Sequence, residues 1–149
     1  MDYATFYLVK LTGISVGGSS SASHGRCSRG LIVDCGNIIS HLPSTPYEKL
    51  QSAFRAAMAA YRSSRATRAT HATTSPDSAT SPCPGRSHLH RRVTVDLDVP
   101  NGLLLDGCLA FTESGPDDYV GFLGNVQMRT LEMLYDVKGA RLGFRAAGC

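Results

Sequence analysis

An apolar run that ends in an acidic residue is the feature of this sequence best suited to chemistry. Residues 31–33 are apolar and lead directly into Asp34, which is followed by Cys35 and Gly36. A carboxylate at the end of a buried strand is costly, and glycine allows a turn there that other residues resist. A carboxyl group held in this way is suited to accepting or donating a proton. Its reaction depends on which partner group the chain supplies.

Two other combinations have residue types that could do chemistry. Cys35 and His41 could be a cysteine nucleophile and its base, but nothing in the sequence indicates an activated thiol or an oxyanion hole. His24 and Cys27, together with those two, have the residue types of zinc ligands, but they come from a polar loop and a strand end. The sequence favours neither site, and we expect no metal and no cofactor.

Strand-like segments flank Asp34 and would position it. Residues 3–17 are typical of one or two strands, and residues 30–34 of another. An extended run over residues 38–43 then stops at a proline. Asp34 is therefore expected in the turn between two strands.

The clearest predicted helix follows that proline. Thr45 is predicted to be its N-cap, Pro46 its first helical residue and Glu48 the end of a capping box. Apolar residues recur at intervals of three and four, which predicts one buried face. That face consists of Tyr47, Leu50, Phe54, Met58 and Tyr61.

Residues 63–92 have no hydrophobic period and are mainly small polar residues and arginine. We expect a disordered or long exposed loop within a single domain of residues 1–149. Residues 62–92 hold six of the 15 basic residues and one of the 12 acidic residues, which leaves 9 and 11 elsewhere. The segment has no aromatic residue to stack on bases, so its charge does not favour nucleic-acid binding.

The rest of the chain predicts strands and one short helix. Residues 94–99 alternate, and residues 103–105 and 108–111 form a hairpin-like pair. A short helix is expected from residue 126 to 133, before two strands that turn at residues 138–139. The fold class is therefore mainly β, with one amphipathic helix and one short helix.

Three separated stretches resemble the pepsin-like aspartic proteases, specifically the plant nepenthesin-like branch, and only its C-terminal lobe. They are LTGISVGG at residues 11–18, GLIVDCGNIISHLP with the helix that follows at residues 30–61, and GFLGNVQMRTLEMLYDVKGARLGF at residues 121–144. The resemblance implies a single lobe, half of a bilobal β-barrel fold. It also implies aspartic endopeptidase activity by descent.

The resemblance assigns roles around the acidic turn. It implies that Asp34 is a catalytic aspartate and that Gly36 and Asn37 lie in the substrate-binding site. It further implies that Cys35, Leu123 and Gly124 support the catalytic loop, because in the family the segment that contains Leu123 and Gly124 passes beneath that loop.

Two positions depart from the family pattern. Cys35 stands where the family has a serine or threonine whose hydroxyl bonds the carboxylate, and a thiol is a weaker donor. Asn37 stands where the family has threonine. We expect both changes to weaken the positioning of Asp34.

A shifted reading frame would explain the low-complexity segment. Plausible codons for residues 69–84, read from each third base, are compatible with the strand segment that the family carries at this point. We hypothesise that residues from about 66 to 92 are translated out of frame, in which case the usual partner of Cys108 is lost. The DNA sequence tests this.

Aspartic proteolysis needs two carboxylates about 3 Å apart that share one proton. Asp34 can be one of them, but no second Asp-Thr-Gly motif precedes it here. Six other aspartates are expected on the solvated surface: Asp96, Asp98, Asp106, Asp117, Asp118 and Asp136.

Three arrangements remain open. A homodimer could bring two Asp34 loops together, or a separate N-terminal lobe could supply the second aspartate; either would act on a peptide or protein substrate. Otherwise the chain is derived from a protease and lacks peptidase activity. It would then be a binding protein resembling the plant xylanase inhibitors, or a defective gene product.

The family implies an extracellular or vacuolar location, but the N-terminus lacks the basic and apolar regions of a signal peptide. The sequence contains no run of about 18 apolar residues, so it does not predict a membrane-spanning helix. The number of cysteines is odd, so at least one is unpaired within the chain. They are Cys27, Cys35, Cys83, Cys108 and Cys149.

Overall fold

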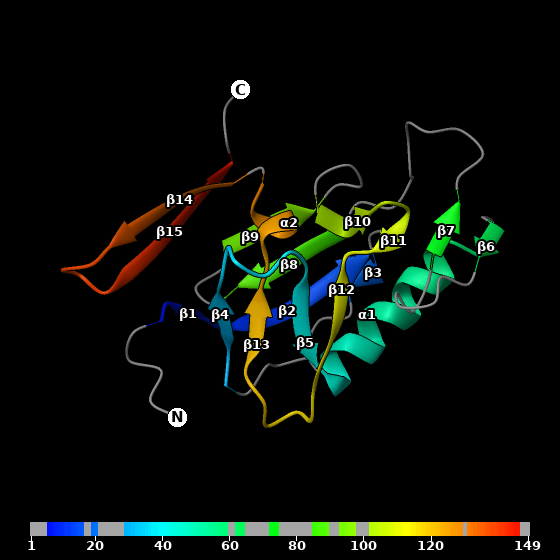
Figure 1. Ribbon diagram of the computed structural model, residues 1–149, viewed down its shortest axis with the longest axis horizontal. Helices are drawn as coiled ribbons and strands as arrows, with labels where there is room; N and C mark the ends of the chain where they lie inside the picture. Colours follow the sequence, from blue (N-terminus) through cyan, green and yellow to red (C-terminus); the bar gives the residue numbers. More distant parts are fainter. Residues whose placement is uncertain are drawn as a thin grey trace.

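The structure is a computed structural model, in which sheets are flanked by a long helix at one end and a two-stranded ribbon at the other (Figure 1). The description covers residues 6–16, 19–20, 29–59, 62–64, 72–74, 85–89, 93–97, 102–129 and 131–146. The predicted mainly β fold class is confirmed.

A five-stranded mixed sheet carries the acidic turn. β13 is parallel to β4 and antiparallel to β5, although β4 and β5 follow each other in the chain. The segment that joins β4 to β5 must therefore cross the end of β13. The strand order is β1 (Leu8–Val9), β4 (Leu31–Val33), β13 (Gly121–Leu123), β5 (Ser40–Pro43) and β12 (Phe111–Gly115).

Two four-stranded sheets complete the body of the fold. One has the order β3 (Ser19–Ser20), β2 (Leu11–Val16), β8 (Gly85–Leu89) and β9 (Val93–Leu97). The other has the order β10 (Leu104–Leu105), β11 (Cys108–Leu109), β7 (Ala72–Thr74) and β6 (Arg62–Ser64).

Residues 63–92 were expected to form one loop, but the parts of this segment that the structure describes are strands. Strands β7 and β8 lie within it, and β6 overlaps its start. β8 pairs with both β2 and β9, so it is an inner strand of its sheet. The other residues of the segment lie outside the described part of the chain.

Helix α1 (Ser44–Ala57) buries the face that its apolar spacing predicts. Tyr47, Leu50, Phe54 and Met58 are all at most 5% exposed, and they join one core with residues of the strands, such as Leu42. Burying each such side chain stabilises the fold by roughly 1.5–3 kcal/mol. Tyr61, the last residue of the predicted face, lies outside the described residues.

The predicted capping of α1 is wrong. Its N-cap is Pro43, and no side-chain cap hydrogen bond is formed there. Instead, Asp117 accepts hydrogen bonds from the Thr45 amide (2.8 Å) and the Thr45 hydroxyl (2.5 Å). Ser44 Oγ lies 2.5 Å from Glu113 Oε1. The unpaired amides of a helix start favour negative charge, and here that charge comes from a distant part of the chain.

The C-terminal end is a short helix followed by a ribbon. Helix α2 (Asn125–Met128) ends five residues before residue 133, the predicted end of this helix. Strand β14 (Leu131–Asp136) begins within the stretch that was predicted to be helical. β14 pairs with β15 (Arg141–Ala146), and the turn between them includes residues 138–139 as predicted. The helix prediction was too long because Leu131 and Met133 also fit the alternation of a strand. No helix within the described residues is long and apolar enough to span a membrane.

The contact between Asp117 and Thr45 predicts an acid-sensitive contribution to stability. The Thr45 side-chain and backbone hydrogen bonds lower the pKa of Asp117 below its unfolded value of 3.8. A lowered pKa means that this stability is complete above the unfolded pKa and is lost as the pH falls through the folded pKa. We expect Asp117→Asn to lower the free energy of unfolding by about 1 kcal/mol or less near pH 6, because the site is exposed.

Urea denaturation near pH 6 and near pH 2 checks this. The difference between wild type and Asp117→Asn should shrink at the lower pH. The matched control is Asp118→Asn, which removes a charge from the neighbouring exposed position and should leave stability unchanged. An equal effect of both substitutions would contradict the cap.

Candidate active site

The loop over residues 34–39 crosses the end of β13, and its backbone is fixed on both sides of the crossing. The Asp34 amide donates to the carbonyl of Leu123 (3.0 Å) at the end of β13. At the start of α2, the amides of Asn125 and Val126 donate to the carbonyls of Asn37 (2.7 Å) and Ile38 (2.9 Å). The first free amides of the short helix thus hold the far side of the loop.

The Asp34 carboxylate is half-buried and is held by its own loop. The Gly36 amide donates to Oδ1 (2.8 Å), and Asn37 Nδ2 donates to Oδ2 (2.8 Å). Each oxygen therefore has one N–H donor that fixes its direction. The Asn37 amide thus bonds the carboxylate directly, a contact that the sequence analysis did not predict.

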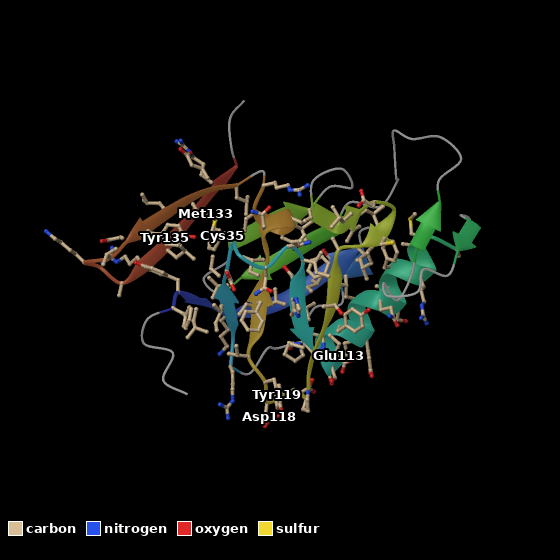
Figure 2. All side chains as sticks on the ribbon, in the orientation of Figure 1. Cys35, Glu113, Asp118, Tyr119, Met133 and Tyr135 are labelled. Atoms are coloured by element: carbon tan, nitrogen blue, oxygen red, sulfur yellow. The ribbon has the colours of Figure 1, made fainter. Side chains whose placement is uncertain are left out.

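Cys35 takes no part in these hydrogen bonds. It is exposed, and no hydrogen bond between its thiol and Asp34 occurs in the described structure. Its neighbour is Tyr135 on β14 (Figure 2). Burial, and to a lesser extent the nearby Cys35 and Tyr7, raise the pKa of the Tyr135 hydroxyl. Tyr7 also packs edge-on against Tyr135, with ring centroids 5.1 Å apart. The loop therefore adjoins the ribbon through Cys35.

Gly124 lies where only glycine fits. A Cβ built on it would be 2.5 Å from the carbonyl carbon and oxygen of Ile39, which is backbone and cannot easily move. The Gly124 amide donates to Ser40 Oγ (2.9 Å). The loop and the end of β13 are thus in backbone contact.

A buried glutamine connects this crossing to two other segments. Gln127 is 1% exposed, and its Oε1 accepts from the amide (3.1 Å) and the hydroxyl (2.7 Å) of Ser40. Its Nε2 donates to the carbonyls of Gly102 (2.6 Å) and Ala110 (2.9 Å). All the hydrogen-bonding capacity of the amide is used. The sequence analysis did not identify Gln127 or Ser40; a polar residue between apolar Val126 and Met128 was the available signal.

The structure brings together five of the residues that the sequence singled out: Asp34, Gly36, Asn37, Leu123 and Gly124. It does not unite Cys35 and His41 in a hydrogen bond; His41 instead packs edge-on against Phe122, with ring centroids 5.8 Å apart. His24 and Cys27 lie outside the described residues. Among the residues that the structure describes, no group of three or more potential metal ligands is found.

The cysteines and acidic residues that the structure describes make no hydrogen bond to the Asp34 carboxylate. Cys35 and Cys108 are free, and the other three cysteines lie outside the description. No second carboxylate is hydrogen-bonded to Asp34 in the described structure. Asp136 accepts from the Gly139 amide (2.8 Å) in the ribbon turn. The arrangement therefore presents one oriented carboxylate.

Because Gln127 joins the loop to two other segments, we expect Gln127→Leu to be strongly destabilising. It would leave the amide and hydroxyl of Ser40 without their acceptor and the carbonyls of Gly102 and Ala110 without their donor, at a cost of roughly 3–5 kcal/mol. Thermal and urea denaturation measure this. The matched control is Gln51→Leu, which removes only a 3.1 Å hydrogen bond to the Tyr47 hydroxyl on the same helix and should cost less than about 1 kcal/mol. Similar losses for both variants would refute the role of Gln127.

Comparison with curated proteins finds plant relatives. The chain is 35% identical over 153 residues to aspartyl protease AED1 of Arabidopsis thaliana, covering 96% of this chain and 32% of the relative. It is 26% identical over 162 residues to aspartyl protease 25 of Oryza sativa subsp. japonica, covering 98% of this chain and 37% of the relative. The chain thus spans about a third of the length of these relatives. No protein-family model matches it.

Solved structures share the fold at low sequence identity. Basic 7S globulin from soybean superposes with a TM-score of 0.77 at 13% identity, over 97% of this chain and 40% of that one. The protein named edgp gives a TM-score of 0.77 at 17% identity, over 93% of this chain and 39% of that one. Together with the crossing of the Asp34 loop over Gly124, these likenesses identify the chain as a homologue of the C-terminal lobe of plant pepsin-like aspartyl proteases.

Proposed function

We propose that this chain supplies one of the two catalytic carboxylates of an aspartic endopeptidase, and that a separate lobe supplies the other. The observation that carries the proposal is the orientation of the Asp34 carboxylate, each oxygen of which has one N–H donor from its own loop. The substrate class is a peptide or protein.

The loop geometry supports this role because it fixes the carboxylate without covering it. Asp34 is half-buried, and the next two residues, Cys35 and Gly36, are exposed. A substrate or a second lobe can therefore approach from that side. The backbone contacts at Leu123 and Gly124 keep the loop in place while it does so.

In the complete site, Asp34 and the second carboxylate would hold one water molecule between them. The ionised carboxylate takes a proton from that water, and the protonated one donates to the carbonyl of the scissile peptide. The intermediate is tetrahedral and is not bonded to the protein. This reaction needs both carboxylates, and this chain would supply one of them.

A binding protein without peptidase activity is the second candidate. The exposed Cys35 favours it, since the thiol lies beside Tyr135 and leaves Asp34 without the hydroxyl donor that the family has at this position. In that case Asp34 is a remnant of the ancestral site. A defective gene product remains the third candidate, and the DNA sequence over residues 66–92 tests it.

A chimera tests the endopeptidase proposal. The C-terminal third of the Arabidopsis relative is replaced by this chain, and cleavage of a denatured protein is measured near pH 3.5, where a shared-proton pair works. We expect the chimera to cleave, and Asp34→Asn to reduce the rate by at least about a hundredfold. The matched control is Asp118→Asn, which removes an exposed carboxylate and should leave the rate unchanged.

Two results would contradict the proposal. One is a folded chimera that does not cleave while the intact relative does; the other is activity that survives Asp34→Asn. Cleavage by this chain alone, lost in Asp34→Asn, would show instead that a second copy supplies the other carboxylate.

A further inference from the structure

The five-stranded sheet has two faces, and the hydrophobic core of the described residues packs against one of them. Leu31 and Leu123, from neighbouring strands, belong to that core cluster. Successive side chains of a strand point to opposite faces, so Ile32 and Phe122, which lie directly opposite each other, belong to the second face. The core cluster includes neither of them.

One row of side chains crosses this second face from one edge of the sheet to the other. Each member lies directly opposite the next one on the neighbouring strand. Leu8 is 45% exposed, and the last three members are half-buried. The row is apolar over three strands and ends in a histidine and a hydroxyl. In strand order it consists of Leu8, Ile32, Phe122, His41 and Thr112.

Asp34 belongs to the same face as this row. It follows Ile32 by two positions, and its amide bonds the Leu123 carbonyl, so the pairing of β4 with β13 continues to this residue. Neighbouring strands lie about 4.8 Å apart, which places His41, two strands across, roughly 10 Å from Ile32. Because an extended peptide advances about 3.3 Å per residue, a peptide bound at Asp34 reaches His41 within about four residues.

We propose that His41 selects an acidic side chain in the peptide that this chain binds. The peptide extends from Asp34 over the second face, and its apolar side chains lie on Ile32 and Phe122. One carboxylate, within about four residues of the scissile bond, binds the imidazole of His41. The proposal rests on the proposed function, because it describes the substrate of the endopeptidase.

The surroundings of His41 support an acidic partner. Its ring packs edge-on against Phe122, with centroids 5.8 Å apart, which fixes its orientation. The residues directly across from it on the two neighbouring strands are Phe122 and Thr112, and neither is titratable. No carboxylate within the described residues forms an ion pair with the ring. Near pH 5, histidine side chains are cationic and peptide carboxylates are ionised, so a substrate carboxylate would supply the missing partner.

Asp34 is the carboxylate on the same face, and it does not take that role. Its two oxygens accept hydrogen bonds from the Gly36 amide and the Asn37 side chain. Two strand positions also separate it from His41 across the sheet. The two groups can therefore bind different parts of one peptide, Asp34 at the reacting bond and His41 at a distant side chain.

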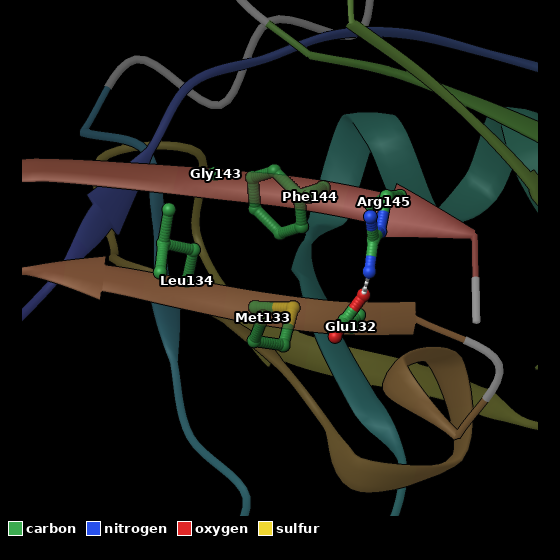
Figure 3. Close-up of a pocket in the computed structure, with 6 residues that line it drawn as sticks. All are labelled: Glu132, Met133, Leu134, Gly143, Phe144 and Arg145. Carbon is green, nitrogen blue, oxygen red and sulfur yellow. Dashed lines mark hydrogen bonds and ion pairs between the residues drawn. The ribbon is translucent and has the colours of Figure 1, made fainter. Parts of the chain in front are cut away.

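The hollow beside the C-terminal ribbon is a different feature (Figure 3). It has a volume of about 410 Å³, and its lining comes from both faces of the ribbon. Met133 and Phe144 pack against the core, whereas Glu132 and Arg145 form an ion pair. The hollow contains no residue of the five-stranded sheet, so it does not extend the second face. Its lining residues are Glu132, Met133, Leu134, Gly143, Phe144 and Arg145.

Peptide binding to the full chain tests the selection without requiring peptidase activity. The probe is a labelled peptide with Thr-Phe-Thr-Glu-Thr-Phe-Thr at its centre, and its counterpart has Gln in place of Glu. Fluorescence anisotropy at pH 5 measures both affinities. We expect the Glu peptide to bind at least about fivefold more tightly, since it alone carries a carboxylate for His41. His41→Gln should remove this preference, and His41→Arg, which keeps a positive charge, should retain it.

A matched control separates this contact from general charge attraction. Lys138→Gln removes a positive charge from the exposed turn of the ribbon and should leave the preference intact. Circular dichroism checks that the variants fold. If His41→Gln does not fold, His41→Asn is the second neutral variant, and it should lose the preference in the same way.

Cleavage by the chimera described above measures the same selection in the reaction. A denatured mixture of proteins is digested at pH 5, and mass spectrometry identifies the residues around each cleaved bond. We expect Asp and Glu to exceed Asn and Gln at least about threefold at one position within about four residues of that bond. His41→Gln should abolish the excess while cleavage continues.

The outcomes distinguish this proposal from the endopeptidase proposal. Equal binding of the two peptides, a preference that survives His41→Gln, or cleavage without any acidic excess would each overturn the role of His41. An inactive chimera together with a preference for the Glu peptide that depends on His41 would overturn the endopeptidase proposal and support the selection.

Discussion

The insertion of β13 between β4 and β5 is the constraint on which the candidate site depends. Because the two strands that flank Asp34 are separated by a third, the loop between them must cross over the end of that third strand. The crossing is so close that Gly124 has no room for a Cβ beside Ile39. The crossing also fixes the loop, because hydrogen bonds hold its backbone to the sheet at Leu123 and to α2 at Asn37.

Polar side chains in this lobe act mainly as structural connectors over long sequence distances. Gln127 joins Ser40 to Gly102 and Ala110 inside the core, and Asp117 holds the start of α1 through Thr45. Each such group is bonded at the point where a backbone donor or acceptor would otherwise be left alone. Asp34 differs from these connecting side chains, because its hydrogen-bond donors come from its own loop and its carboxylate is only half-buried.

Local sequence patterns predicted the helices and many of the strands, but they could not predict contacts between residues far apart in the sequence. The spacing of Leu50 and Phe54 predicted the buried face of α1, since helical periodicity depends only on neighbours in the sequence. The capping prediction at Thr45 failed because its true partner, Asp117, is 72 residues away. The hydrogen bond from Asn37 to Asp34 was not predicted for a different reason: the side-chain amide reaches the carboxylate only through the tight turn at Gly36. The strand β8 was missed because pairing with β2 and β9 outweighs its weak propensity.

The Asp34 carboxylate is oriented by donors of its own loop and not by a partner group. Aspartic proteolysis uses two carboxylates that share one proton, so the endopeptidase proposal requires a second carboxylate on the exposed side of that loop. Two copies of Asp34 are chemically equivalent to a dyad, so the chemistry alone does not decide between a second copy of this chain and a different lobe. Cys35 and Gly36, the exposed residues next to Asp34, leave that side of the loop open to either.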